Sequence, residues 1–188
     1  RLAQAFLISG PPGVGKGCLV DQLIGLLLCK AKQAEERPCG HCADCHLLAA
    51  GNHPDQVRLA PAAEGASAEI RADAVRALCS REGLTPTRGE TKVLVVRPAE
   101  AMNAFAANSL LKTLEEPVAS SIWLLVSEQP QRLPQTIRSR CQRLDLAPPP
   151  ESEALPWLRS RLGEQAPQCI DAAALCLRLA HGAPLQAL

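Results

Sequence analysis

The chain has 188 residues, a net charge of +1 from 20 Lys and Arg against 19 Asp and Glu, and only two Phe, two Trp and no Tyr. This length allows one domain with a buried core and a small second domain. The balanced charge and the scarcity of aromatic rings argue against a strongly basic or base-stacking nucleic-acid binder. No apolar run reaches the roughly 20 residues of a membrane span, and no signal-peptide pattern opens the chain, so we expect a soluble cytoplasmic protein.

The first motif is Gly10-Pro11-Pro12-Gly13-Val14-Gly15-Lys16, which follows an apolar run and precedes a helical pattern. This is the setting of a phosphate-binding loop, whose glycines let backbone N–H groups surround phosphate oxygens while a lysine adds charge. The next position calls for Ser or Thr to bind Mg²⁺, and here it is Gly17. We expect a degenerate loop that binds nucleotide weakly and without Mg²⁺; the alternative is a glycine-rich turn that binds no nucleotide. Its candidate residues are Gly10, Gly13, Gly15, Lys16 and Gly17.

Apolar runs of strand character alternate with helical patterns along the chain. The runs are Ala5–Ile8, Val57–Leu59, Val93–Val96, Ile122–Val126 and Leu144–Leu146. This alternation predicts an α/β fold with a parallel five-stranded sheet and helices on both faces. The expected helices are Lys16–Cys29 (apolar face Leu19, Leu23, Leu26 and Leu27), Ala72–Ser80, a helix from the N-cap Asn103 to Pro117, Ala154–Leu162 and Ile170–Ala180.

A proline-rich segment, residues 147–150, has neither a helix nor a strand pattern and is expected to link two domains. The sequence thus predicts an α/β core over 1–147 and a small all-helical domain over 148–188. Because the chain starts without Met and ends in an apolar stretch, we expect it to be part of a longer protein.

Four of the nine cysteines, namely Cys29, Cys39, Cys42 and Cys45, are spaced C-x9-C-x2-C-x2-C. Two consecutive C-x2-C steps place three thiolates on one tight turn, and a fourth from the preceding helix completes a tetrahedron. The sequence therefore predicts a structural zinc module over about 29–46, with no open position for a substrate. His41 and His46 are the rival ligands.

The motifs together resemble a known family. The phosphate loop and cysteine module are followed by Asn108-Ser109-Leu110-Leu111-Lys112-Thr113-Leu114-Glu115-Glu116-Pro117 and then by Ile137-Arg138-Ser139-Arg140-Cys141. In this order the motifs resemble the bacterial DNA polymerase III clamp loader, whose subunits are AAA+ proteins. The resemblance implies a helical lid domain after the core and an all-helical collar domain beyond Leu188. It also places Lys112, Glu115 and Glu116 near DNA or a neighbouring subunit; a solvated helix end is the alternative.

The resemblance also identifies positions at which residues needed for ATP hydrolysis in the family are replaced. The acidic Walker B pair that holds Mg²⁺ in the hydrolysing subunits aligns with Pro98 and Ala99, and the sensor-2 arginine aligns with Leu185. Glu100 follows one residue late, as a displaced base or, as we prefer, a solvated residue that starts a helix. Ser127 is the nearest polar residue to the sensor-1 position.

The Ser139-Arg140-Cys141 motif, in contrast, is intact. In the family its arginine projects onto the γ-phosphate held by a neighbouring subunit, so the resemblance implies that Arg140 is an arginine finger acting in trans. A surface arginine in a salt bridge is the alternative. This combination of lost and intact motifs resembles that of the rigid, non-hydrolysing subunit of the hetero-pentameric ring. Such a subunit is an accessory of the polymerase holoenzyme. The resemblance therefore implies delta, gamma or tau subunits, the sliding clamp and primed DNA as partners.

Two other functions compete with this hypothesis. An ATP-hydrolysing motor subunit of gamma or tau type requires Ser or Thr at position 17 and an acid at 98 or 99, and this sequence has neither. An unrelated P-loop kinase or transferase also needs magnesium ligands, and it leaves the cysteine module and the Ser-Arg-Cys motif unexplained.

Overall fold

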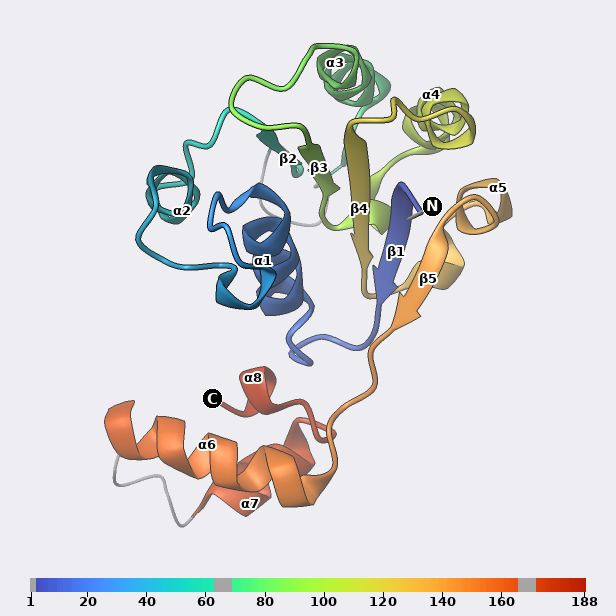
Figure 1. Cartoon of the computed structure of the whole chain (residues 1–188). Coiled ribbons are helices and arrows are strands. Elements are labelled where there is room, and N and C mark those ends of the chain that lie inside the picture. The colour runs from blue at the N-terminus through green and yellow to red at the C-terminus, as the bar shows by residue number, and fades with distance from the viewer. Residues whose placement is uncertain (1–2, 63–68, 166–171) are drawn as a thin grey trace.

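Figure 1 shows the computed structural model of the chain, which describes residues 3–62, 69–165 and 172–188. One parallel sheet of five strands runs in the order β2-β3-β4-β1-β5, which confirms the predicted sheet. The strands are β1 (Ala5–Ser9), β2 (Gln56–Leu59), β3 (Lys92–Val96), β4 (Ser121–Ser127) and β5 (Gln142–Asp145). β5 begins at the polar Gln142, ahead of its apolar run, because this edge strand is mostly exposed.

Helices form at all the predicted places that the structure describes. They are α1 (Lys16–Leu28), α2 (Ala43–Ala49), α3 (Ala72–Glu82), α4 (Ala104–Glu115), α5 (Gln135–Arg138), α6 (Glu151–Gln165), α7 (Ala173–Leu179) and α8 (Pro184–Ala187). The Asn103 side chain accepts a hydrogen bond of 2.8 Å from the Ala106 N–H, as expected of an N-cap. The predicted helix Ile170–Ala180 is only partly assessed, since 166–171 lie outside the described residues.

The sheet has a separate apolar core on each face, because successive strand residues point to opposite sides. On one face Leu94, Val96, Trp123 and Leu125 pack against α3, α4 and α5, and on the other Val93, Val95, Leu124 and Val126 pack against α1. Figure 1 shows the helices on the two sides of the sheet. The predicted three-layer arrangement is confirmed.

The apolar face of α1 differs from the prediction. The side chains in the core are those of Val20, Ile24 and Leu28, which recur every four residues. Leu19, Leu23 and Leu27 are only partly buried, and Leu26 is 42% exposed, so its inclusion in the face was wrong. Leucine covers both sides of this helix, so composition alone did not determine which side faces the sheet.

Helices α6, α7 and α8 pack around a third apolar cluster that includes Leu158, Leu162 and Leu177. They follow β5 after an irregular stretch at 146–150, and Figure 1 places α8 beside the loop between β1 and α1. Among the described helices, none is long and apolar enough to cross a membrane.

Candidate functional site

Lys16, the lysine of the glycine loop, is turned back onto its own loop. Lys16 is the first residue of α1, and its side chain is 3% exposed. Nζ donates to the carbonyl oxygens of Gly10 at 2.9 Å and Pro11 at 2.7 Å, and it lies 3.4 Å from Oε1 of Glu128. Two of the three N–H donors of the ammonium group thus bind the loop itself, and the Glu128 carboxylate forms an ion pair with the charge. The charge that a phosphate loop offers to a nucleotide is therefore engaged within the chain.

Helix α8 lies directly against the same loop. The N–H of Leu185 donates to the carbonyl of Gly13 at 3.0 Å, and a Cβ on Gly13 would come within 2.5 Å of Cβ of Gln186. Leu185, the position aligned with sensor 2, lines the remaining pocket of about 320 Å³ together with Gly15 and Gly17. This volume is at the lower limit of small-molecule sites.

The guanidinium group of Arg97 lies next to Gly17, a contact that the sequence motifs did not predict. A Cβ on Gly17 would be 2.5 Å from Nη1 of Arg97, which follows the last residue of β3. The next two residues, Pro98 and the buried Ala99, provide no carboxylate. A cationic group thus lies beside the position where the motif would place a magnesium ligand.

Glu100 is held by the chain in a structural contact. Its Oε1 accepts hydrogen bonds from the backbone N–H groups of Glu128 at 2.9 Å and Gln129 at 3.2 Å. The carboxylate therefore fixes the loop that follows β4. Ser127, at the end of β4, is fully buried, and its hydroxyl has no hydrogen-bond partner among the described residues.

The Ser-Arg-Cys motif holds its arginine between two anchored neighbours. The Ser139 hydroxyl donates to the carbonyl of Thr136 at 3.2 Å, and the Cys141 side chain is buried in the core, where burial raises its pKa to about 11. Between them the Arg140 side chain is 33% exposed. Its Nε donates to Oε1 of Glu115 at 2.8 Å, its Nη2 donates to the same oxygen, and its Nη1 donates to the Thr136 carbonyl at 2.9 Å.

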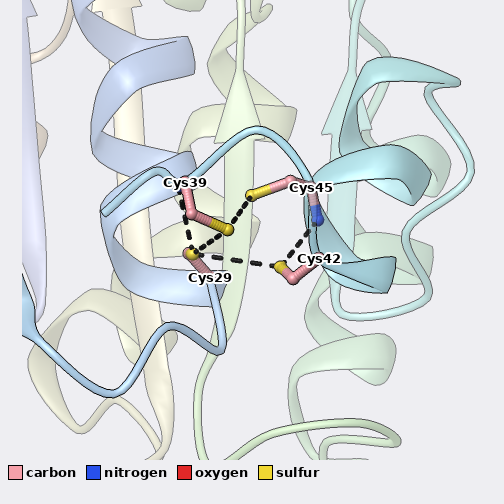
Figure 2. Close-up of side chains that lie close together, drawn as sticks. All are labelled: Cys29, Cys39, Cys42 and Cys45. Atoms are coloured by element: carbon pink, nitrogen blue, oxygen red, sulfur yellow. Dashed lines mark hydrogen bonds between the residues drawn. The ribbon is translucent and has the colours of Figure 1, made fainter. Parts of the chain in front are cut away.

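The four predicted cysteines come together at one point (Figure 2). Their sulfur atoms all lie within 4.8 Å of one another. The separations are 3.5 Å from Cys29 to Cys39, 3.9 Å from Cys29 to Cys42 and 3.9 Å from Cys39 to Cys45. A tetrahedral zinc with Zn–S bonds of about 2.3 Å requires sulfur atoms roughly 3.8 Å apart. The cluster therefore has the right donor type and dimensions to hold zinc.

Local folding explains how the sulfurs converge. Cys29 follows the last turn of α1, Cys42 is the N-cap of α2, and Cys45 lies in the first turn of α2. The N–H groups of Ala31 and Cys39 donate to the Cys29 sulfur, and the N–H of Cys45 donates to the Cys42 sulfur, each at 3.4 Å. Neither rival histidine belongs to the described cluster, and the ring of His41 contacts the Cys39 carbonyl at 2.8 Å.

The cysteines differ in how readily they ionise. Hydrogen bonds from backbone N–H groups, first that of Lys30, lower the pKa of Cys42 to about 6. Burial raises the pKa of Cys45 to about 12. For Cys29, burial opposes ionisation, but backbone hydrogen bonds from Cys39 and Ala31 outweigh it, so that its pKa is lowered. A divalent cation would supply the charge that lets all four groups exist as thiolates.

A buried polar network joins the cysteine module to the sheet. Asp44 of α2 accepts a hydrogen bond from Arg88 Nε at 2.7 Å and lies 3.1 Å from Nε2 of His53. Nδ1 of His53 accepts from the Asp55 N–H at 3.1 Å, which assigns the ring proton to Nε2 and orients it towards Asp44. Asp55 in turn accepts from the N–H groups of 87–89. The module is thereby fixed to the start of β2.

Comparison with known proteins identifies relatives over almost the whole chain. A sequence profile of the family described as "DNA polymerase III, delta subunit" matches residues 1–150. A DNA polymerase III subunit delta' from Pseudomonas aeruginosa is 42% identical over 185 residues, covering 98% of this chain and 55% of that protein. The subunit delta' of Escherichia coli is 41% identical over 185 residues, with 98% and 53% covered. The chain thus spans about half the length of these relatives.

A more distant relative is the DNA polymerase III subunit tau of Escherichia coli, 33% identical over 146 residues, with 78% of this chain and 22% of that protein covered. Among solved structures, a Thermotoga maritima RuvB variant matches with a TM-score of 0.57 at 16% identity, covering 98% of this chain and 51% of that one. A gamma subunit-related protein from the same organism gives 0.55 at 19%, covering 89% and 50%. These likenesses confirm the predicted AAA+ core at the level of the fold.

Proposed function

The chain belongs to the DNA polymerase III delta-subunit family, and on that premise we propose that it is a delta-prime-type, non-hydrolysing subunit of the clamp loader. In this proposal it assembles with delta and with gamma or tau subunits in the cytoplasm. Through that complex it takes part in loading the sliding clamp onto primed DNA. The chain spans about half the length of its delta' relatives, so the partners of the whole protein are part of this proposal.

The absence of ATP hydrolysis is inferred from the glycine loop. Lys16 is bonded to its own loop and to Glu128, the Arg97 guanidinium lies against Gly17, and α8 contacts Gly13. Hydrolysis in P-loop enzymes needs a free lysine at the phosphates and an acid that holds Mg²⁺. These contacts support a loop that serves to attach α8 to the core.

The proposed active role falls on Arg140. Its side chain is partly exposed and lies beside the anchored Cys141, which fits a group that reaches a neighbouring subunit. An arginine supplied in trans stabilises the charge of the phosphoryl-transfer transition state and is worth roughly 10³–10⁵ in rate at the site it serves. The observation that carries the proposal is a contrast in exposure: the Lys16 side chain is 3% exposed and bonded to its own loop, whereas the Arg140 side chain, although paired with Glu115, is 33% exposed.

The test is ATP turnover by the reconstituted clamp-loader complex, measured with clamp and primed DNA. Arg140→Ala should lower turnover, whereas Lys16→Ala should leave it nearly unchanged. Arg143→Ala is the matched control, because Arg143 is 52% exposed and pairs only with Asp145 of the same strand among the described residues. Unchanged turnover with Arg140→Ala, or ATPase activity of the purified chain alone, would overturn the proposal.

The motor function remains the second candidate because of the likeness to subunit tau. It predicts the opposite result: Lys16→Ala would lower turnover, and the isolated chain would bind ATP with Mg²⁺. The same experiment therefore separates the two functions.

For the cysteine cluster we propose a structural zinc ion. Cys29, Cys39, Cys42 and Cys45 would complete a tetrahedral coordination shell, which leaves no position for a substrate. The ion would hold α2 against the end of α1, and the network through Asp44 would attach that unit to the sheet.

A further inference from the structure

The Arg140 guanidinium is held by Glu115, which belongs to the α4 motif, and by the carbonyl of Thr136 in α5. Glu115, the last residue of α4, accepts from both Nε and Nη2 through one carboxylate oxygen. The Thr136 carbonyl, at the start of α5, accepts from Nη1. Helices α4 and α5, which carry separate sequence motifs, therefore meet at this arginine.

A count of the N–H donors of Arg140 shows how many of them remain available to bind another group. A guanidinium has five N–H groups: one on Nε and two on each terminal nitrogen. Three hydrogen bonds to Glu115 and Thr136 use one donor on each nitrogen. Nη1 and Nη2 thus each keep one N–H with no partner among the described residues. Two terminal N–H groups are the donors with which arginine binds two oxygens of a phosphate.

The carboxylate of Glu115 lies at an unfavourable end of α4, which suggests that its role is not to stabilise the fold. A negative charge in the last turn of a helix opposes the helix dipole, and here Glu115 and Glu116 occupy the last residue and the C-cap of α4. The side chain of Glu115 is 48% exposed, and exposed ion pairs stabilise proteins by only about 0–1 kcal/mol. The pair with Arg140 therefore adds little to the fold.

We propose that Glu115 is a positioning residue, which orients the Arg140 guanidinium so that Nη1 and Nη2 face an anionic phosphate held by the neighbouring subunit. This inference rests on the proposed role of Arg140 as a finger in trans. A fixed guanidinium loses less conformational freedom when it meets the phosphate than a free one does. Glu115 itself touches no nucleotide and acts only through the arginine.

The chain provides a matched control for Glu115. Glu116 is the adjacent acid, it is exposed, and its side chain makes no hydrogen bond or ion pair with the described residues. Replacing either glutamate by Gln changes the net charge equally and leaves the size nearly unchanged. A difference between the two variants therefore reports the contact with Arg140.

The experiment measures ATP turnover by the complex reconstituted with the full-length protein, using Glu115→Gln, Glu115→Ala, Glu116→Gln, Arg140→Ala and the double variant Glu115→Ala/Arg140→Ala. Co-elution with the other subunits shows that each variant folds and assembles. We expect Glu115→Ala to reproduce most of the loss of kcat seen with Arg140→Ala, with KM for ATP unchanged. Glu115→Gln should fall between it and the wild type, and Glu116→Gln should lose clearly less turnover than Glu115→Gln. The double variant should lose no more than Arg140→Ala alone.

The outcomes distinguish the positioning role of Glu115 from the proposed role of Arg140 as a finger in trans. If Arg140→Ala lowers turnover but Glu115→Ala leaves it unchanged or raises it, the positioning role is wrong while the proposed function stands. A further loss in the double variant would also overturn positioning, because Glu115 would then act elsewhere. If Arg140→Ala itself has no effect, the proposed function fails, and this inference fails with it.

Discussion

The guanidinium of Arg97 lies where a side chain at Gly17 would begin, because a Cβ on Gly17 would be only 2.5 Å from Nη1 of the arginine. The two residues are far apart in the sequence but adjacent at the carboxyl end of the sheet. A cation at this point opposes the binding of Mg²⁺ electrostatically. The loop therefore lacks the magnesium-binding hydroxyl at position 17 and the acids at positions 98 and 99, and it also has the positive charge of Arg97 beside it.

The first prediction concerns restoration of the metal site. Gly17→Thr supplies the hydroxyl and must displace the Arg97 guanidinium, but the positive charge of Arg97 stays near the loop and positions 98 and 99 still lack an acid. Calorimetric titration with ATP should therefore give the same affinity with and without Mg²⁺. Combining Gly17→Thr with Arg97→Ala and Pro98→Asp should produce magnesium-dependent binding. Tightening of ATP binding by Mg²⁺ in the single variant would contradict this account.

The second prediction concerns the contact between the glycine loop and α8. Gly13 has φ +75°, and its Cβ would collide with Gln186; Gly51 has φ +71°, and its Cβ would meet nothing within 4 Å. Gly51→Ala should therefore lose roughly 1–2 kcal/mol of unfolding free energy for the left-handed backbone alone. Gly13→Ala should lose about 1–3 kcal/mol more from overpacking.

Urea unfolding compares the two variants, and hydrogen exchange locates the effect. The Leu185 N–H, which donates to Gly13, should exchange faster in Gly13→Ala and remain unchanged in Gly51→Ala. Equal losses of stability in both variants would show that α8 does not depend on the loop.

The sequence was most informative where residues are buried on both faces. The apolar runs at Val93–Val96 and Ile122–Val126 predicted β3 and β4 almost to their ends, because these central strands contact helices on both sides. The cysteine cluster was predicted in full, since coordination chemistry restricts both the residue type and the spacing. Short helices such as α5 and α8 were missed, because four residues are too few to show helical periodicity.

The contacts around the motifs were not predictable in the same way. Arg97 against Gly17, and Glu115 with Arg140, join residues from distant parts of the chain. Only the strand order brings the first pair together, and only the packing of α4 on α5 brings the second. The sequence therefore indicated the candidate motif residues, but it could not predict their contacts, which depend on tertiary packing.

The third prediction concerns the buried carboxylate of Asp55. Burial alone would raise its pKa, but hydrogen bonds from the N–H groups of Thr87, Arg88 and Gly89 outweigh burial, and the pKa is lowered below its ordinary value of 3.8. A carboxyl group with a lowered pKa in the folded state stabilises the fold above its unfolded pKa, and this contribution is lost as pH falls through the folded pKa. Asp55→Asn should cost about 3 kcal/mol at pH 7, since hydrogen bonds to a charged group are worth roughly 1.5–3 kcal/mol.

Urea unfolding of both proteins between about pH 3 and pH 7 provides the test. The difference in stability between wild type and Asp55→Asn should shrink below about pH 4. Asp73→Asn is the control, because Asp73 is 87% exposed and pairs only with Arg76 on its own helix among the described residues. A difference that stays constant across this range would rule out the ionised carboxylate as the source of stability.

The fourth prediction concerns zinc. Cys42→Ser replaces a thiolate by a hydroxyl, a much poorer zinc ligand, whereas Cys18→Ser alters an exposed thiol outside the cluster. Metal analysis of reduced, desalted protein should find about one zinc per chain in the wild type and in Cys18→Ser, and little in Cys42→Ser. No zinc in the wild-type protein would refute the four-cysteine site.

Chelation should loosen the module without unfolding the sheet. The amides of α2 should exchange faster after zinc removal, because the cysteine ligands hold this helix to the end of α1. Those of β4 should stay protected, because the core packs around Trp123, Leu124 and Leu125 without contribution from the ligands. The network from Asp44 through His53 should keep α2 near the sheet even without metal, so the loss should be local. Loss of protection throughout the chain on chelation would instead mean that zinc supports the whole fold.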